Sequence, residues 1–208
     1  TIAQVIIIDG KLSTLIDIVR EGRLVINNIT RSASMYYLKT MYIIGFSILA
    51  ILLNIPFPFI PFQITIMDMF VEGFPSFMLT FERIIDKPKE SIASHVLRFS
   101  MPNALAITLS LIVTYGLAVY FKMSQQQLFT MLFFICSFIS IQLIYRIYKP
   151  LNIFRTIILI LDILGLFVAI YLFTPLLDFS PINLTMSTII VLITLLSFVL
   201  VTFIAKLV

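Results

Sequence analysis

Charged residues are scarce in this chain: of its 208 residues, only 12% are Asp, Glu, Lys or Arg. A soluble domain typically contains about 25% charged residues, and so little charge cannot cover a surface that faces water. Hydrophobic residues, by contrast, make up 61% of the chain. The composition therefore predicts a multi-pass membrane protein whose main partner is the lipid bilayer.

Cysteine and histidine are nearly absent, with one residue of each type. Cys136 lies in an apolar run, where it cannot form an intrachain disulfide and is interpreted as a packing residue. His95 lies in a charged loop, and we expect it to be solvated. Soft metals prefer Cys and His ligands, so the sequence offers no site for such a metal.

Six stretches are apolar and long enough to cross a bilayer, for which a helix needs about 20 residues. Prolines separate them; Pro88 and Pro102, for example, bracket the connector after the second stretch. We therefore expect an all-α membrane domain of six transmembrane helices in residues 35–208. The predicted spans are 35–55, 62–81, 101–121, 126–145, 153–173 and 184–207.

The cations are distributed unequally between the two sides of these spans. By the positive-inside rule, the side rich in Lys and Arg is cytoplasmic, which predicts two cytoplasmic termini in a plasma-membrane protein. The net charge of +4 thus indicates orientation, and we expect no nucleic-acid partner. One side carries only Lys122, and the other carries Lys11, Arg20, Arg23, Arg31, Arg83, Lys87, Lys89, Arg98, Arg146, Lys149, Arg155 and Lys206.

The first 34 residues have a different pattern. Residues 3–8 form a short, β-branched apolar run that is typical of a buried parallel strand, and residues 9–11 predict a turn. Thr14 and Asp17 have the spacing of a capping box, and apolar residues then recur at helical spacing up to the first span. We expect a strand, a turn and a stalk helix, which would form the edge of a soluble α/β domain.

Polar residues in the second predicted span recur every three or four positions, so they form one stripe on a helix. The stripe consists of Thr65, Asp68, Glu72, Ser76 and Thr80. Asp68 and Glu72 are one turn apart, at a depth where each charge costs about 2.5–3.5 kcal/mol on insertion scales. A helix that keeps this pair needs compensation from a bound cation, from protonation or from Lys39 in the first span.

Pro75 and Gly73 lie beside this pair of carboxylates. Pro75 has no N–H, so the carbonyl of Val71 loses its helical partner, and Gly73 loosens the same turn. Carboxylate, carbonyl and hydroxyl oxygens are the ligands that Ca²⁺ and Mg²⁺ prefer. The pattern predicts a site for a hard cation, with ligands from Asp68, Glu72, the carbonyl of Val71 and Thr40.

Other interpretations of these residues stay open. The two carboxyl groups could carry protons, or could hydrogen-bond between helices without binding an ion. Lys39 could be a built-in counter-ion, or could snorkel to the cytoplasmic interface. Asp162, central in the fifth span, could form a structural hydrogen bond or belong to the ion path. The candidates for a counter-ion or for the ion path are Lys39, Thr65, Ser76 and Asp162.

Two motifs resemble those of the P-type (E1–E2) cation-transporting ATPases, at the separation that this family shows. The first is similar to the end of the family's phosphorylation domain, and the second to its sixth transmembrane helix. The first motif consists of Asp9, Leu12-Ser13-Thr14-Leu15, Val19, Glu21-Gly22-Arg23 and Asn27-Asn28. The second consists of Pro61-Phe62-Gln63, Asp68 and Glu72-Gly73-Phe74-Pro75.

The resemblance implies that the six spans are the family's helices five to ten. The fourth helix, the phosphorylated Asp and the nucleotide-binding domain would then lie upstream of Thr1, where the sequence shows neither an initiator Met nor a signal peptide. No Asp-Lys-Thr-Gly-Thr motif occurs, so we expect this fragment to be inactive alone. ATP and Mg²⁺ would act only in the parent ATPase, and the residues of the first motif would couple its soluble domains to the ion site.

The chain departs from the calcium pumps of this family at several positions. Ile43 stands where those pumps have Glu, and Asp68 and Glu72 stand where they have Asn and Asp. The run from Lys39 to Tyr42 resembles a bacterial branch with a Lys-Thr-x-Tyr pattern. One cation per cycle, Ca²⁺ or Mg²⁺, is therefore expected rather than two.

Two other functions compete with the pump. One is a proton-coupled secondary transporter that uses Asp68 and Glu72 as a relay, and the other is a non-transporting scaffold that binds partners through its basic loops. The sequence upstream of Thr1 discriminates between them, because only the pump requires the phosphorylation motif there.

Overall fold

The computed structural model describes residues 12–88 and 90–207, within which helix is the only regular structure. The predicted strand at residues 3–8 and the turn after it lie outside the described residues. Five helices are long and apolar enough to cross a membrane, namely α1, α4, α5, α6 and α7. The elements are α1 (Leu12–Leu53), α2 (Pro61–Met67), the π-helix η1 (Asp68–Gly73), α3 (Phe74–Leu79), α4 (Ile92–Tyr120), α5 (Gln125–Tyr148), α6 (Ile153–Leu172), the 3₁₀-helix η2 (Thr174–Leu176) and α7 (Leu184–Leu207).

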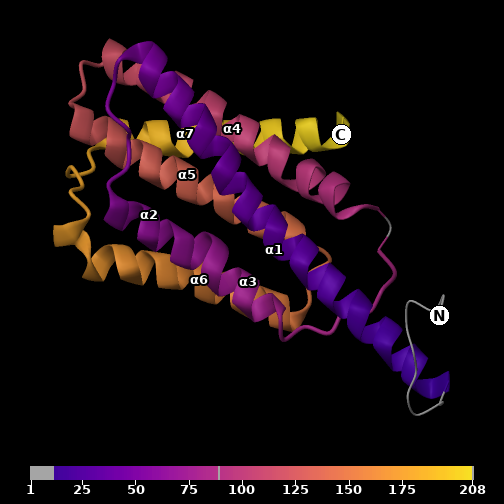
Figure 1. Ribbon diagram of the computed structural model, residues 1–208. Helices are drawn as coiled ribbons and strands as arrows, with labels where there is room; N and C mark the ends of the chain where they lie inside the picture. The colour runs from indigo at the N-terminus through magenta and orange to yellow at the C-terminus, as the bar shows by residue number, and fades with distance from the viewer. Residues whose placement is uncertain (1–11, 89, 208) are drawn as a thin grey trace.

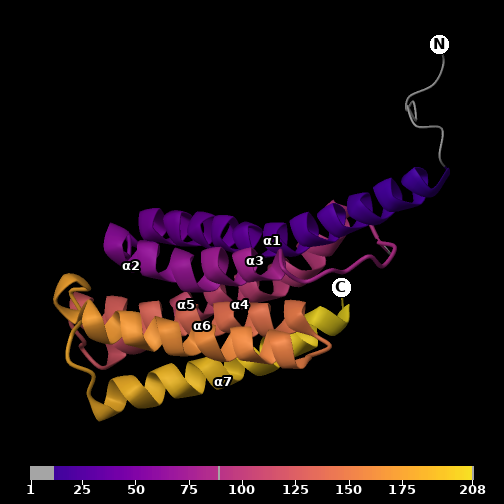
Figure 2. The same ribbon diagram turned by 90° about the horizontal axis from the view of Figure 1, so that it is seen from below.

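Helix α1 is continuous over 42 residues, which confirms the predicted run of the stalk helix into the first span. Its first turns project beyond the rest of the bundle (Figures 1 and 2), and residues 15–22 are exposed. The predicted capping box at Thr14 is wrong, because Leu12 and Ser13 are already helical. Thr14 and Asp17 therefore lie inside the first turns, and not at the start of the helix.

The second predicted span is not one regular α-helix. The chain runs through α2, η1 and α3 without a break, and Pro61 begins the segment at a position where its missing N–H is not needed. From Pro61 to Leu79 the segment is about 28 Å long at 1.5 Å per residue. The π-turn in its centre was not predicted, and it carries both Asp68 and Glu72.

Side-chain caps begin the later helices. The backbone N–H of Ser94 donates to Ser91 Oγ at 3.2 Å at the start of α4, and the N–H of Arg155 donates to Asn152 Oδ1 at 2.8 Å at the start of α6. Pro102 was predicted to lie at the end of the connector before the third span. This prediction is wrong, because α4 already begins at Ile92. Pro102 lies inside the helix, where a proline disturbs the preceding turn.

The helices pack around α5, which contributes the largest share of fully buried side chains, among them Phe133, Ile139 and Tyr148. Helix α4 lies between α1 on one side and α5 and α7 on the other, while α6 packs against the α2–η1–α3 segment. Figure 2 shows α1 and α7 on opposite faces of the bundle. The segment with Asp68 and Glu72 is thus held between α1 and α6.

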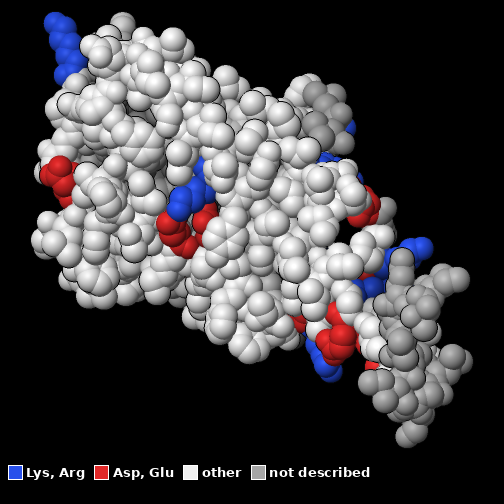
Figure 3. Space-filling view, in the orientation of Figure 1, with Lys and Arg blue, Asp and Glu red and all other residues white. Residues whose placement is uncertain are grey.

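Helix α1 begins and α7 ends at the same end of the bundle (Figure 1). On the face in Figure 3, most charged atoms lie near the ends of the molecule. One group of both signs lies in the middle of this face, over α1 and η1. The middle of the bundle is otherwise covered by uncharged residues on this face, as a lipid-facing surface requires.

Candidate cation site in the membrane

Lys39 on α1 and Asp68 on η1 form an ion pair in the middle of the bundle. The distance from Lys39 Nζ to Asp68 Oδ2 is 2.6 Å, and the two side chains are 25% and 36% exposed. Lys39 was expected either to be a built-in counter-ion or to snorkel to the cytoplasmic interface. The contact with Asp68 is the geometry that a counter-ion requires. The charge of Asp68 is compensated within the chain itself.

Glu72 has a different environment from Asp68, although both lie in the same π-turn. The residue is only 4% exposed, and the described part of the chain provides no hydrogen bond or ion pair to its carboxylate. Lys39 and Asp68 act on it electrostatically with opposite signs. Because an unpartnered carboxylate at this depth is unfavourable, Glu72 needs either a cation or a proton.

The π-turn changes which backbone oxygens are free near Glu72. The N–H of Phe74 donates to the carbonyl of Met69, five residues earlier, so the hydrogen-bond register differs from that of an α-helix. Continued by one residue, this register pairs Pro75 with the carbonyl of Phe70 instead of the predicted Val71, and Pro75 has no N–H to donate to it. The carbonyl of Pro75 itself accepts a hydrogen bond of 3.1 Å from the buried hydroxyl of Tyr148.

Phe70 holds the π-turn against α6. A methyl group added at Gly165 of α6 would overlap the aromatic ring of Phe70, so the glycine permits a close approach of the two elements. Gly165 was not singled out from the sequence, because nothing in the sequence pairs it with the second span. The chemical signal for the π-turn was the combination of Gly73 and Pro75.

The hydroxyl groups of the polar stripe bond mostly to their own helix. Thr65 is exposed and donates to the carbonyl of Pro61 at 3.0 Å, while the buried Ser76 donates to Gly73 at 3.1 Å. Thr40 is exposed on α1, and its hydroxyl lies 3.3 Å from the carbonyl of Tyr36. The structure therefore groups Asp68, Glu72 and Ser76, whereas the threonines face outward.

Asp162 lies on α6, packed toward the same interior. It is 1% exposed, and neither carboxylate oxygen has a hydrogen-bond partner within the described residues. The interpretation of Asp162 as a structural hydrogen-bonding residue therefore finds no partner here. Its carboxyl acts electrostatically on Tyr148, the residue that binds the Pro75 carbonyl.

The predicted coupling residues all lie on the outer part of α1. Asn27 Nδ2 donates to the carbonyls of Ile84 and Asp86 at 2.9 and 3.0 Å, which ties the stalk to the loop between α3 and α4. Glu21 lies 3.2 Å from Arg83 of the same loop, in an exposed pair. The other predicted coupling residues make no such link. A methyl group added at Gly22 would meet no neighbouring side chain. Arg23 has no ion pair among the described residues, and the buried Asn28 Oδ1 has no hydrogen-bond partner there.

Glu82 forms a cluster that the sequence analysis missed. Its carboxylate accepts from Arg31 of α1 at 3.0 Å, from Arg155 of α6 at 2.8 and 3.0 Å, and from Asn152 at 3.0 Å. Burial alone would raise the pKa of Glu82, but the hydrogen bonds from Arg155, Asn152 and Arg31 outweigh it and hold the pKa below its usual 4.5. In the sequence, these residues share only their position near the ends of predicted spans, on the same side of the membrane.

The described residues contain no group of three or more His, Cys, Asp or Glu side chains that could hold a metal ion. The candidate site consists of two carboxylates, the amine of Lys39 and a π-turn followed by a proline that has no N–H. Such a set cannot enclose a divalent cation alone, since Ca²⁺ takes six to eight oxygen ligands. It can provide one side of a site that other helices or water complete.

An all-helical, multi-pass chain with buried carboxylates in a broken helix has the features of proteins that move ions through membranes. Similar proteins agree with this class. The "Probable cation-transporting ATPase exp7" of Streptococcus pneumoniae is 31% identical over 180 residues, which cover 83% of this chain and 23% of that protein. The calcium-transporting ATPase CtpE of Mycolicibacterium smegmatis is 32% identical over 130 residues, 56% of this chain and 16% of that protein.

The calcium-transporting ATPase CtpE of Mycobacterium bovis is likewise 33% identical over 129 residues, 57% of this chain and 16% of its own length. No family model matches the sequence. The chain spans less than a quarter of the length of these curated relatives. It is homologous to part of the cation-transporting ATPases, the family that its motifs resemble.

Proposed function

We propose that this chain provides the membrane part of an ATP-driven cation pump and forms one wall of its intramembrane cation site. The observation that carries the proposal is Glu72, a buried carboxylate without a hydrogen-bond or ion-pair partner among the described residues, next to an Asp68 that Lys39 already neutralises. This arrangement leaves one negative charge available to a transported cation. The relatives, which include calcium-transporting ATPases, support a divalent ion, Ca²⁺ or Mg²⁺.

The proposed ligands are Glu72 and Asp68, the carbonyl of Val71 or of Phe70 in the π register, and Thr40. Thr40 would have to turn its hydroxyl away from the carbonyl of Tyr36. The amine of Lys39 supplies one positive charge beside the site, which supports one ion per cycle rather than two. Asp162 and Ser76 would line the path next to the site, and Thr65 would lie at its outer end.

The parent protein would supply the remaining parts. Upstream helices would complete the ion site, and upstream cytoplasmic domains would bind ATP and Mg²⁺ and carry the phosphorylated Asp. The α2–η1–α3 segment would be a sixth crossing in addition to the five long helices, since its length of about 28 Å nearly matches a hydrocarbon core of about 30 Å. Both termini would then be cytoplasmic, in the plasma membrane.

The outer part of α1 would couple phosphorylation to the ion site. Residues 1–34 would join the phosphorylation domain, and the uninterrupted helix would carry its movement to Lys39. Asn27 and the Glu82 cluster tie this helix to the loops on the same side. A movement of the stalk would therefore displace the π-turn segment as well.

The test is ion-dependent formation of the phosphoenzyme in the whole protein. Glu72→Gln keeps the shape of the side chain and removes its charge, so half-maximal phosphorylation should need at least about ten-fold more ion, the equivalent of about 1.4 kcal/mol. Glu90→Gln, which neutralises a carboxylate in the loop outside the bundle, is the matched control and should keep the wild-type ion dependence.

Wild-type ion affinity in Glu72→Gln would exclude the proposed site. A whole protein that forms no phosphoenzyme, but moves protons when Glu72 is present, would instead support the secondary transporter.

A further inference from the structure

A second site lies outside the proposed ion path, where α4, α5 and α7 meet at the end of the bundle at which α5 and α7 finish. It is a pocket of about 530 Å³, and the described residues that line it include four cationic side chains and no carboxylate. The lining residues are Arg98, Phe99, Gln142, Tyr145, Arg146, Lys149, Phe198, Thr202, Ala205 and Lys206. The proposed pump function uses none of them.

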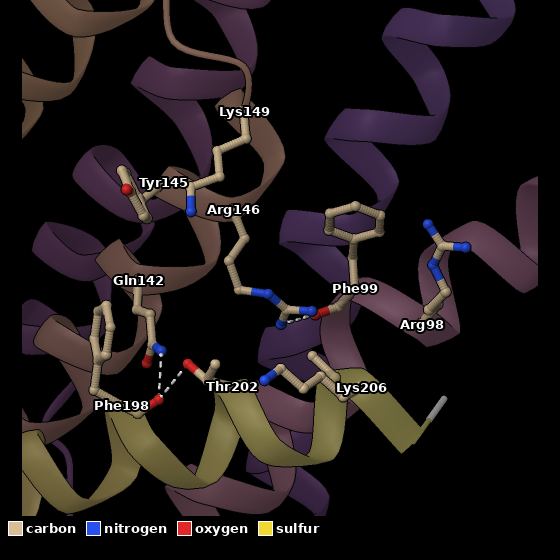
Figure 4. A pocket seen from close by; sticks show the side chains of 10 residues that line it. Arg98, Phe99, Gln142, Tyr145, Arg146, Lys149, Phe198, Thr202 and Lys206 are labelled. Atoms are coloured by element: carbon tan, nitrogen blue, oxygen red, sulfur yellow. Dashed lines mark hydrogen bonds between the residues drawn. The ribbon is translucent and has the colours of Figure 1, made fainter.

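The cations of this pocket come from the ends of three helices, α4, α5 and α7. Figure 4 shows the ammonium groups of Lys149 and Lys206 and the guanidinium of Arg146 directed toward the space between α5 and α7. Arg98 and Arg146 flank the ring of Phe99, with guanidinium carbons 5.5 and 5.4 Å from its centre. Several like charges around one space repel each other unless an anion lies between them.

Arg146 is held in place by hydrogen bonds that do not neutralise it. Its Nη1 atom donates to the carbonyl of Phe99 at 3.0 Å and to Asn103 Oδ1 at 2.6 Å. Lys149 lies 4.5 Å from the ring of Tyr145, and neither Lys149 nor Lys206 forms an ion pair within the described part of the chain. Of the four cations, Arg98 is the only one with a carboxylate nearby among the residues that the structure describes, namely Glu90 at 3.6 Å.

The C-termini of α5 and α7 explain part of this charge, because a helix C-terminus attracts cations. Each contributes about half a negative charge, so the two termini and Glu90 together leave about two of the four positive charges without compensation. An anion with several oxygen acceptors would compensate the rest. A phosphate group fits this description, since Arg and Lys bind its oxygens with charge-assisted hydrogen bonds.

The lining of the pocket indicates which phosphate-bearing molecule fits. Besides the four cations it contains the rings of Phe99, Tyr145 and Phe198 and the methyl group of Ala205. The three helices that form it are long and apolar enough to cross a membrane. A soluble phosphate has no part that would cover such apolar side chains, whereas the acyl chains of a lipid would.

We propose that the pocket binds the phosphodiester headgroup of an anionic phospholipid, with its acyl chains in the adjoining leaflet of the bilayer. Basic pockets between transmembrane helices are suited to such headgroups. The lipid would belong to the leaflet on the side where α7 ends, which is the proposed cytoplasmic side. Its role would be to join α7 to α4 and α5 at an end where the like charges otherwise separate them.

Native mass spectrometry of the delipidated whole protein tests this proposal, with phosphatidylglycerol and phosphatidylcholine of identical chains as probes. Phosphatidylglycerol should bind the wild type more tightly than phosphatidylcholine. Lys149→Gln with Lys206→Gln should weaken it about 25-fold, because each cation near an anionic lipid contributes about 1 kcal/mol. The matched control, Arg20→Gln with Lys87→Gln, removes two cations from the same side and should bind like the wild type.

A further variant separates loss of binding from loss of folding. Ala205→Trp fills the pocket but keeps all four cations, and it should also lose the preference for phosphatidylglycerol. Glycerol phosphate, which carries the headgroup chemistry without chains, should not displace the lipid. Equal affinity of the wild type for both lipids, wild-type binding by either pocket variant, or displacement by glycerol phosphate would each overturn the proposal.

Discussion

The ion pair between Lys39 and Asp68 determines the net charge of the proposed site. With both carboxylates ionised, two carboxylates and one amine carry a net charge of −1, and the charge that Lys39 does not neutralise belongs to Glu72. Removing either partner of the pair leaves an uncompensated charge next to Glu72. The pair therefore affects the ion affinity through its charge, although the ammonium of Lys39 cannot itself ligate a cation.

This charge balance predicts the outcome of a double-mutant cycle. In Asp68→Asn, the freed ammonium of Lys39 competes with the cation for Glu72, so ion affinity should fall about ten-fold, or about 1.4 kcal/mol. Adding Lys39→Gln removes that competitor and should restore most of the affinity. Ion-dependent phosphorylation of the three variants is the measurement, and a double variant that binds more weakly than Asp68→Asn would contradict the prediction.

Glu82 gives the chain a sensitivity to acid. Its pKa is lower in the folded protein than in the unfolded chain, so the folded state is stabilised above pH 4.5 and loses this stabilisation as the pH falls through the folded pKa. In neutral solution, Glu82→Gln should lower the free energy of unfolding by about 2 kcal/mol, because hydrogen bonds to a charged group are lost.

The difference in melting temperature between the wild type and Glu82→Gln should shrink on acidification below pH 4.5, as the wild-type carboxylate is protonated. Asp17→Asn, at an exposed carboxylate on the stalk, is the control and should leave the melting temperature unchanged at neutral pH. A difference that stays constant from neutral to acidic pH would show that the charge of Glu82 is not the cause.

At the scale of the elements, the π-turn depends on its contact with α6. Gly165→Ala adds a methyl group where the ring of Phe70 lies, and overpacking of this kind costs about 1–3 kcal/mol. The variant should lower both stability and ion affinity, since displacing the ring of Phe70 from α6 also disturbs the turn that carries Glu72. Phe70→Leu in the same protein should recover much of the loss.

Gly116→Ala provides the comparison for Gly165→Ala. No atom lies near the position of the added methyl group, so this change should raise stability, by up to about 1 kcal/mol, through better helix propensity. Thermal unfolding measures stability, and ion-dependent phosphorylation measures the site. Equal effects of both alanine variants would mean that α6 does not hold the turn.

The long apolar helices could be predicted from the sequence because each needs only composition and length. The π-turn could not be predicted, because Gly73 and Pro75 indicate a disturbed helix but do not determine which hydrogen bonds it forms. The pairing of Lys39 with Asp68 was one of two interpretations, and only packing distinguishes between them. Contacts between distant segments, such as Gly165 with Phe70 or Glu82 with Arg31 and Arg155, leave no pattern within either segment.

At the scale of the whole molecule, the distribution of cations predicts the topology. A single Cys introduced at Asp86, in the loop between α3 and α4, should be inaccessible to an impermeant thiol reagent in intact cells. A Cys in place of Lys122, in the loop between α4 and α5, should be labelled. Cys136 is buried and should contribute no background, and labelling at Asp86 from outside would reverse the proposed orientation.

The Lys39–Asp68 pair also bears on how the protein enters the membrane during synthesis. The α2–η1–α3 segment carries two carboxylates, and each costs about 2.5–3.5 kcal/mol in the middle of a lone helix. Lys39 carries a similar penalty within α1, the segment that precedes it in the chain. Joined across 2.6 Å, the two opposite charges neutralise each other, so the two segments partition into lipid more favourably as a hairpin than one after the other. The residues that set the charge of the mature site would thus also make α1 the insertion partner of the segment that carries Glu72.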